Sequence, residues 1–139
     1  MRMKRFSKYW LPAIFWVVVI FFFSSFPTKQ TTEIFWQDFL LKKTAHFIEF
    51  GILAVLLYRA FINSGFKTKN AIIYSVIFFV LYAISDEFHQ SFIPGREPRV
   101  RDVIIDMTGG ILSLYSIKGL LPQAPVKVKY WAKKFDIVQ

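Results

Sequence analysis

The protein has 139 residues, of which 55% are hydrophobic and 19% aromatic, and its formal net charge is +9. This length predicts one domain, and the hydrophobic residues lie in long blocks, which is typical of a membrane protein and argues against a water-soluble core. Cysteine is absent, which excludes disulfides, thiol catalysis and zinc–thiolate sites.

Four apolar segments are long enough to cross a bilayer. They cover residues 9–26, 44–62, 71–90 and 102–121. We therefore expect an all-α, four-transmembrane-helix bundle that forms a single membrane domain over residues 1–139. The first segment follows a basic head, but Ser24-Ser25-Phe26-Pro27 lacks a small-x-small cleavage site, so we interpret it as a retained helix and not as a signal peptide. Pro27 is expected to end it.

The connection between the first two segments has two interpretations. Residues 33–41 place Ile34, Phe35 and Phe39 on one side, as a short helix lying in the membrane interface would. A loop that contains a few apolar residues is the alternative, and the sequence does not decide between them.

The distribution of Lys and Arg predicts that both termini lie in the cytoplasm. With the N-terminus inside, twelve of the eighteen basic residues fall on the inner side and six on the outer side, as the positive-inside rule requires. The tail, residues 122–139, is basic and interleaves Tyr130, Trp131 and Phe135 with lysines, which predicts a segment resting on the membrane surface. Lipid head groups are therefore the expected anionic partner, and nucleic acid is not.

One stretch, Ser85–Asp106, holds five of the nine acidic residues. The topology brings the end of the third span, the start of the fourth and the start of the second to one end of the bundle, which we predict to be the outer end. Nine of the ionisable and amide side chains at these three ends and in the loop Ser91–Arg101 are the candidate site residues. They are Lys43, His46, Glu49, Asp86, Glu87, Gln90, Arg96, Asp102 and Asp106.

Energetics predict that these side chains face the bundle interior. An ionisable group in a spanning segment costs about 2.5–3.5 kcal/mol near the bilayer centre and less near its surface, so the groups should pair with one another. The small residues Gly109, Gly110 and Ser113 should let a neighbouring helix approach closely at this level. We therefore expect an outward-facing polar pocket.

Three motifs in this order resemble the signature of the VanZ-like family of small bacterial membrane proteins. They are Lys43-x-x-His46-Phe47-x-Glu49-Phe50, Asp86-Glu87-x-His89-Gln90 with Pro94-Gly95-Arg96, and Asp102-x-x-x-Asp106-x-x-Gly109. The resemblance covers Lys43 to Leu114, with Phe50 where the family more often has Tyr and Asp106 where Asn is as common. It implies the bacterial cytoplasmic membrane and a link to resistance against teicoplanin-type glycopeptides, and it leaves the biochemical activity open.

Two functions follow as alternatives. The pocket could bind or modify a cell-envelope component, with Lys43, Arg96 and His46 holding a phosphate or carboxylate of an envelope precursor or lipid head group. The cluster could instead be structural, in a non-enzymatic bundle that acts through a partner protein. Whether a reaction is catalysed, and the oligomeric state, stay open.

A metal site and a proton relay are weaker interpretations of the same residues. His46 and Glu49 share a helical face, but the cations Lys43 and Arg96 nearby disfavour a metal ion. The inner halves of the spans are apolar apart from Arg59, which disfavours a relay. We predict no cofactor and no metal.

Overall fold

The computed structural model of the protein describes residues 2–27, 35–96 and 99–138, and these ranges contain helices and no strand. The α-helices are α1 (Arg2–Ser24), α2 (Phe35–Asn63), α3 (Thr68–Gln90), α4 (Val100–Tyr115) and α5 (Val126–Lys134). A π-helical turn, Ser116–Leu120, and a 3-10 turn, Leu121–Gln123, join α4 to α5. The all-α prediction is therefore confirmed.

Four helices are long and apolar enough to cross a membrane. The spans are Phe6–Ser24, Leu40–Asn63, Thr68–Gln90 and Val100–Gln123, which confirms the four predicted segments to within a few residues. Their outer surfaces carry exposed apolar side chains, such as Phe15 (66% exposed), Leu81 (61%) and Phe88 (68%). Contiguous surfaces of this kind are rare on soluble monomers and are matched by lipid tails, which are themselves apolar.

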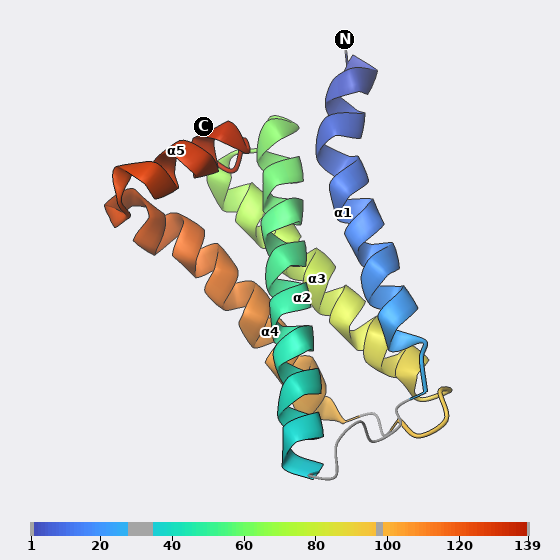
Figure 1. Cartoon of the computed structure of the whole chain (residues 1–139). Coiled ribbons are helices and arrows are strands. Elements are labelled where there is room, and N and C mark those ends of the chain that lie inside the picture. The colour runs from blue at the N-terminus through green and yellow to red at the C-terminus, as the bar shows by residue number, and fades with distance from the viewer. Residues whose placement is uncertain (1, 28–34, 97–98, 139) are drawn as a thin grey trace.

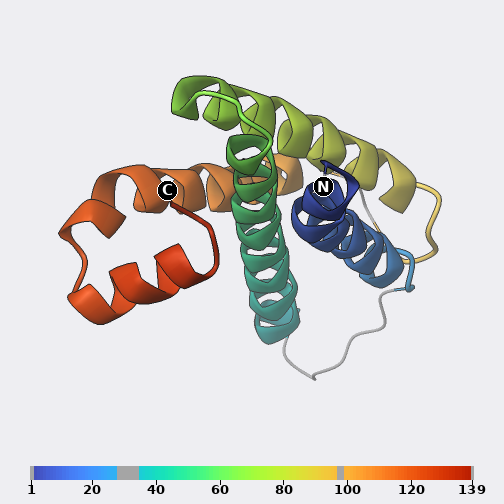
Figure 2. The same ribbon diagram turned by 90° about the horizontal axis from the view of Figure 1, so that it is seen from above.

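Helix α2 occupies the middle of the bundle. It packs against α1, α3 and α4, as the views in Figures 1 and 2 both show. The core forms where these helices meet, around the fully buried side chains of Ile20, Phe50, Leu53 and Phe79. Because α2 is covered from three sides, functional groups on its inward faces can meet groups from each of the other spans.

The closest approach in the bundle is between α2 and α4, and glycine makes it possible. A Cβ at Gly109 would collide with the backbone carbonyl of Phe47, and a Cβ at Gly51 would lie 2.7 Å from Ser113 Oγ. A Cβ at Gly110 would lie 2.8 Å from the ring of Phe79 on α3. The prediction that small residues of the fourth span admit close neighbours is confirmed, and this contact sets the distance between the two helices that carry five of the candidate residues.

Two segments differ from the expectations. Residues 35–41 form the first turns of α2, a helix about 44 Å long at 1.5 Å per residue, and so are neither a separate interfacial helix nor a loop. The rest of that connection, 28–34, lies outside the described residues. The basic tail contains the helix α5, whose formation the sequence analysis did not predict.

Candidate functional site

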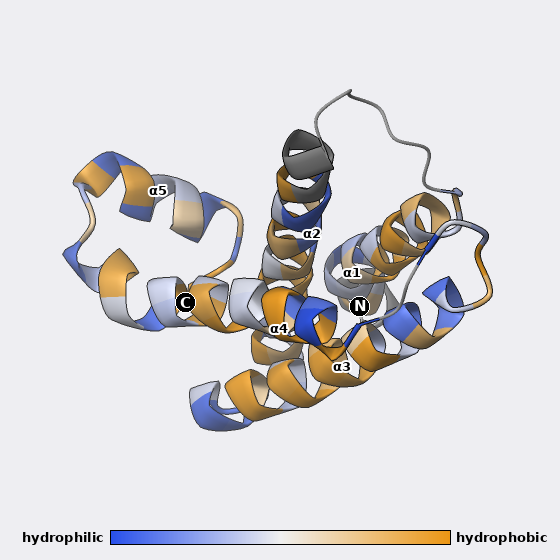
Figure 3. Ribbon diagram, turned by 90° about the horizontal axis from the view of Figure 1, so that it is seen from below, coloured by the Kyte–Doolittle hydropathy of each residue, from blue (hydrophilic) through white to orange (hydrophobic). Residues whose placement is uncertain are grey.

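The start of α2, the end of α3, the start of α4 and the loop between α3 and α4 meet at one end of the bundle. Figure 1 shows this end opposite to the two chain termini. Figure 3, viewed from this end, shows hydrophilic residues at the end of α3 and at the start of α4. The prediction that these three helix ends share one end of the bundle is confirmed.

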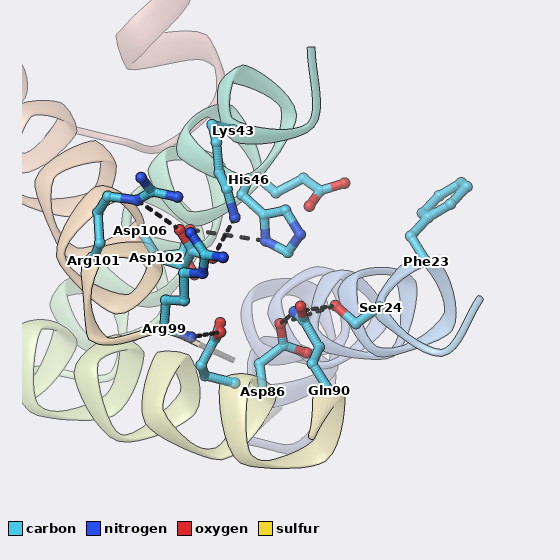
Figure 4. Close-up of polar contacts among 12 residues, drawn as sticks. Phe23, Ser24, Lys43, His46, Asp86, Gln90, Arg99, Arg101, Asp102 and Asp106 are labelled. Carbon is cyan, nitrogen blue, oxygen red and sulfur yellow. Dashed lines mark hydrogen bonds and ion pairs between the residues drawn. The ribbon is translucent and has the colours of Figure 1, made fainter. Parts of the chain in front are cut away.

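Two contacts between titratable side chains, one of them a lysine–carboxylate ion pair, connect α2 with α4. Lys43 Nζ lies 2.5 Å from Asp102 Oδ2, and His46 Nδ1 lies 3.8 Å from Asp106 Oδ1 (Figure 4). The spacing along each helix explains why both contacts form, because residues three apart on α2 and four apart on α4 both lie one turn above the other. Both aspartates are buried, and their side chains are 10% (Asp102) and 3% (Asp106) exposed.

A second set of contacts connects α3 with α1. Asp86 Oδ2 accepts hydrogen bonds from Ser24 Oγ (2.9 Å) and from Gln90 Nε2 (2.7 Å), as Figure 4 shows. Asp86 and Gln90 lie one turn apart on α3, and both are buried with Ser24. A carboxylate is tolerated at this depth because neighbouring donors replace part of its lost hydration.

Arg96 joins the loop to this second set. Its Nη1 donates to Gln90 Oε1 (2.9 Å), Nη2 to the carbonyl of Phe23 (3.2 Å) and Nε to the carbonyl of Phe26 (3.4 Å). The preceding Gly95 has a φ of 80°, the left-handed region in which glycine is unstrained. Partial burial lowers the pKa of the Arg96 guanidinium from its ordinary value, and the charges of Asp86, Glu87 and Glu49 oppose that shift.

Glu87 and Glu49 have different surroundings. Glu87 Oε1 accepts a hydrogen bond from the backbone N–H of Arg99 (2.7 Å), the residue before the first turn of α4, so it helps to fix where that helix begins. The carboxyl of Glu49 lies within electrostatic reach of Asp86 and Arg96. Its backbone carbonyl accepts a hydrogen bond from Trp16 Nε1 of α1 at 2.9 Å.

His46 lies between the two sets of contacts. The charges of Asp86 and Arg96 act on it from one side, and those of Lys43 and Asp102 act on it from the other. The structure therefore brings the nine candidate residues together, and we call them the polar cluster.

The contribution of α1 was missed in the sequence analysis. Ser24 is 1% exposed and bonded to Asp86, and two carbonyls at the end of α1 accept from Arg96. The adjacent Ser25 Oγ lies 3.1 Å from His89 Nε2, whose ring lies against Phe21. A signal existed, because Ser24 and Ser25 are the first hydroxyl residues after a long apolar run.

The cations of the polar cluster already have acceptors within the protein. Lys43 contacts Asp102, and Arg96 contacts Gln90 and two carbonyls. Two buried carboxylate oxygens, Asp86 Oδ1 and Asp102 Oδ1, have no hydrogen-bond partner in the described part of the chain, although Arg101 Nε lies 3.6 Å from the latter. The cluster can therefore accept hydrogen bonds directly, whereas holding an anion requires Lys43 or Arg96 to exchange partners.

A metal site has no support from the geometry. Within residues 2–27, 35–96 and 99–138, no three side chains of His, Asp or Glu are arranged so that they could hold a metal ion. The charge balance agrees with this, since Lys43 and Arg96 lie among the carboxylates.

Comparison with known proteins identifies the family. Residues 9–121 match the family described as VanZ/LLP1, so the match extends from the first span to the end of the fourth. No curated protein and no solved structure matches the chain. Because the family match covers most of the sequence and the four apolar helices that could cross a membrane, the chain is a multi-pass membrane protein that belongs to the VanZ/LLP1 family.

Proposed function

We propose that the polar cluster is a binding site for a cell-envelope component, and that the protein acts on the outer side of the bacterial cytoplasmic membrane. The component is an envelope precursor or a lipid head group, which the protein binds or modifies. The connection to glycopeptides of the teicoplanin type is part of this proposal, and it rests on the resemblance of the motifs to the VanZ-like family.

The orientation in this proposal rests on charge. Counted along the sequence, the basic residues of the segments assigned to the inner side outnumber those assigned to the outer side by twelve to six, which favours both termini in the cytoplasm. The polar cluster lies at the end opposite to the termini (Figure 1). With the termini inside, the cluster faces the envelope.

The observation that carries the proposal is the convergence of so many polar groups on one point. Side chains from α2, α3, α4 and the α3–α4 loop meet there, and five of them are carboxylates. A polar contact between membrane helices contributes only about 0.6 kcal/mol on average, while each ionisable group costs more than that to bury. The stability of the bundle alone therefore does not explain why all nine polar residues are present in the cluster.

The structural alternative keeps one observation in its favour. Several contacts join different helices, such as Lys43 with Asp102 and Ser24 with Asp86, and these would hold the bundle in register without any ligand. In that case the protein works through a partner protein. The two functions predict different behaviour when a pair is exchanged.

The test is glycopeptide susceptibility in cells that carry single substitutions, measured together with the abundance of each variant in the membrane. The variants are His46→Ala, Asp86→Ala and Arg96→Ala, with Lys69→Ala at the opposite end of the bundle as the matched control. We expect the three variants to remain in the membrane and to lose protection, and the control to behave as the parent protein.

A charge exchange separates the two functions. Lys43→Asp combined with Asp102→Lys preserves an ion pair between α2 and α4 but reverses its direction. If the pair belongs to a binding site, the double variant reaches the parental abundance in the membrane but gives no protection. If the pair is structural, the double variant reaches both the parental abundance and the parental protection. Recovery of both, or loss of all cluster variants from the membrane, would favour the structural alternative.

The orientation has its own test, because the chain contains no cysteine. Ser91→Cys, beside the cluster, and Lys67→Cys, at the opposite end, can be treated with a membrane-impermeant thiol reagent in intact cells. We expect labelling at position 91 and none at position 67, and the reverse pattern would place the cluster in the cytoplasm.

A further inference from the structure

Helix α5 lies beside the bundle at the end that carries the termini (Figures 1 and 2). After α4 the π-helical and 3-10 turns reverse the chain, and α5 runs back toward α2 instead of continuing the span (Figures 1 and 2). We call residues 124–138 the C-terminal strap.

The far end of the strap is fixed to α2. Arg59 Nε donates to the carbonyl of Phe135 (2.6 Å), and Asn63 Nδ2 donates to the carbonyl of Asp136 (2.9 Å). Asp136 has a φ of 53°, a left-handed conformation that Asp adopts more readily than most residues. With α4 at one end and these bonds at the other, α5 is held at both ends.

The same anchor reaches α1. The carboxylate of Asp136 lies 2.7 Å from Lys8 Nζ and 3.7 Å from Arg59 Nη2. Pro12 has no N–H to offer the carbonyl of Lys8 four residues earlier, and Arg59 Nη1 lies 3.5 Å from that carbonyl. The strap therefore bridges the first and second spans through one carboxylate.

The surface of α5 is basic and aromatic. The helix contains four lysines and no carboxylate, and the one acidic residue of the strap, Asp136, is paired with Lys8. Tyr130 and Trp131 are 61% and 50% exposed, and Lys134 Nζ lies 4.7 Å from the Trp131 ring centroid. Positive charge beside exposed aromatic rings is the combination found on helices that lie at a membrane surface.

We propose that the C-terminal strap lies in the head-group layer and binds anionic phospholipids at the end of the bundle that carries the termini. Its position beside the ends of the spans places it at that layer, and its four lysines complement negatively charged head groups. Because it is held at both ends, the helix loses little freedom on binding. This inference does not depend on the proposed function of the polar cluster.

The test uses the full chain, purified in detergent and mixed with equal amounts of phosphatidylglycerol and phosphatidylcholine. Native mass spectrometry measures which lipid stays bound. We expect a preference for phosphatidylglycerol that falls about fivefold for each lysine replaced near an anionic surface, as in the pair Lys127→Gln and Lys129→Gln. These side chains are exposed, so folding, checked by circular dichroism, should be unchanged.

The matched control is the pair Lys67→Gln and Lys69→Gln, which removes the same charge from the residue before α3 and from its first turn, at the same end of the bundle. We expect it to retain most of the preference. Equal loss in the two pairs would mean that the lipid responds to net charge and not to the strap, and equal retention of both lipids by the parent protein would also overturn the proposal.

Discussion

The polar cluster and the anchor of the C-terminal strap both join helices through ion pairs, but they differ in exposure. In the cluster, the side chains of Lys43 and Asp102 are 22% and 10% exposed, whereas in the anchor those of Lys8 and Asp136 are 56% and 33% exposed. A buried charge that loses its partner is expensive, while an exposed one is hydrated. Similar contacts at the two ends should therefore tolerate substitution very differently.

The largest effect is expected from Lys43→Met, which removes the nearer of the two cations beside the buried Asp102 and leaves Arg101 Nε at 3.6 Å. Removing one partner of a buried pair costs about 3–5 kcal/mol, and we expect a loss of that size in the free energy of unfolding, measured by denaturant titration in detergent. The double variant Lys43→Met with Asp102→Asn should recover most of it. A single variant as stable as the parent protein would show that this pair is effectively solvated and would remove the contrast between the two ends.

The next effect concerns the close approach of α2 and α4 beside the cluster. Gly109→Ala should cost about 1–3 kcal/mol, because the new Cβ would collide with the carbonyl of Phe47 and the helices must separate. Gly119→Ala, near the strap, is the control, since its Cβ would lie 3.4 Å from the exposed ring of Tyr115. Thermal unfolding of the two variants measures the difference, and equal midpoints would contradict it.

A smaller effect is expected from Asp136→Asn at the strap. The pairs with Lys8 and Arg59 are lost, but exposed pairs contribute little to stability, so we expect no measurable change in the free energy of unfolding. The strap itself should loosen. A nitroxide attached at Val128→Cys should report faster motion in the variant, whereas unchanged motion would show that the backbone bonds to Arg59 and Asn63 hold the strap alone.

The smallest effect is a dependence on pH. The hydrogen bond from Lys8 lowers the pKa of the Asp136 carboxyl below its ordinary value of 3.8. Because the pKa is lower in the folded than in the unfolded state, the anchoring contribution is complete above about pH 4 and is lost as the pH falls through the folded-state pKa. The nitroxide at position 128 should therefore become more mobile only in acid, and Asp136→Asn should abolish that response.

The sequence predicts the four spans and the meeting of three helix ends, because long apolar runs and alternating topology determine both. It also indicates Gly109 and Ser113 as contact residues, since small side chains in a spanning helix let a neighbouring helix approach closely. It does not predict that Lys43 takes Asp102 as its partner, because that choice depends on side-chain directions in three dimensions. The acceptors of Arg96 are backbone carbonyls, and any residue type can supply those.

The attachment of the C-terminal strap to α2 could not be predicted from the sequence for a related reason. The basic and aromatic residues indicate a membrane surface, but the anchor uses the carbonyls of Phe135 and Asp136, which carry no side-chain pattern. Arg59 was noted only as an isolated charge among apolar residues. Its partners in the strap lie more than seventy residues later in the chain, and spacing on one helix contains no information about them.

The contacts of Arg96 can form only late in membrane insertion. Its acceptors, the carbonyls of Phe23 and Phe26, precede it by 73 and 70 residues. Synthesis proceeds from the N-terminus, so the end of α1 leaves the ribosome well before Arg96 does. Until Arg96 arrives, the carbonyls of Phe23 and Phe26 must accept hydrogen bonds from water or from lipid head groups. Asp102 and Asp106 emerge later still, so the polar cluster is completed only when the last span has been inserted.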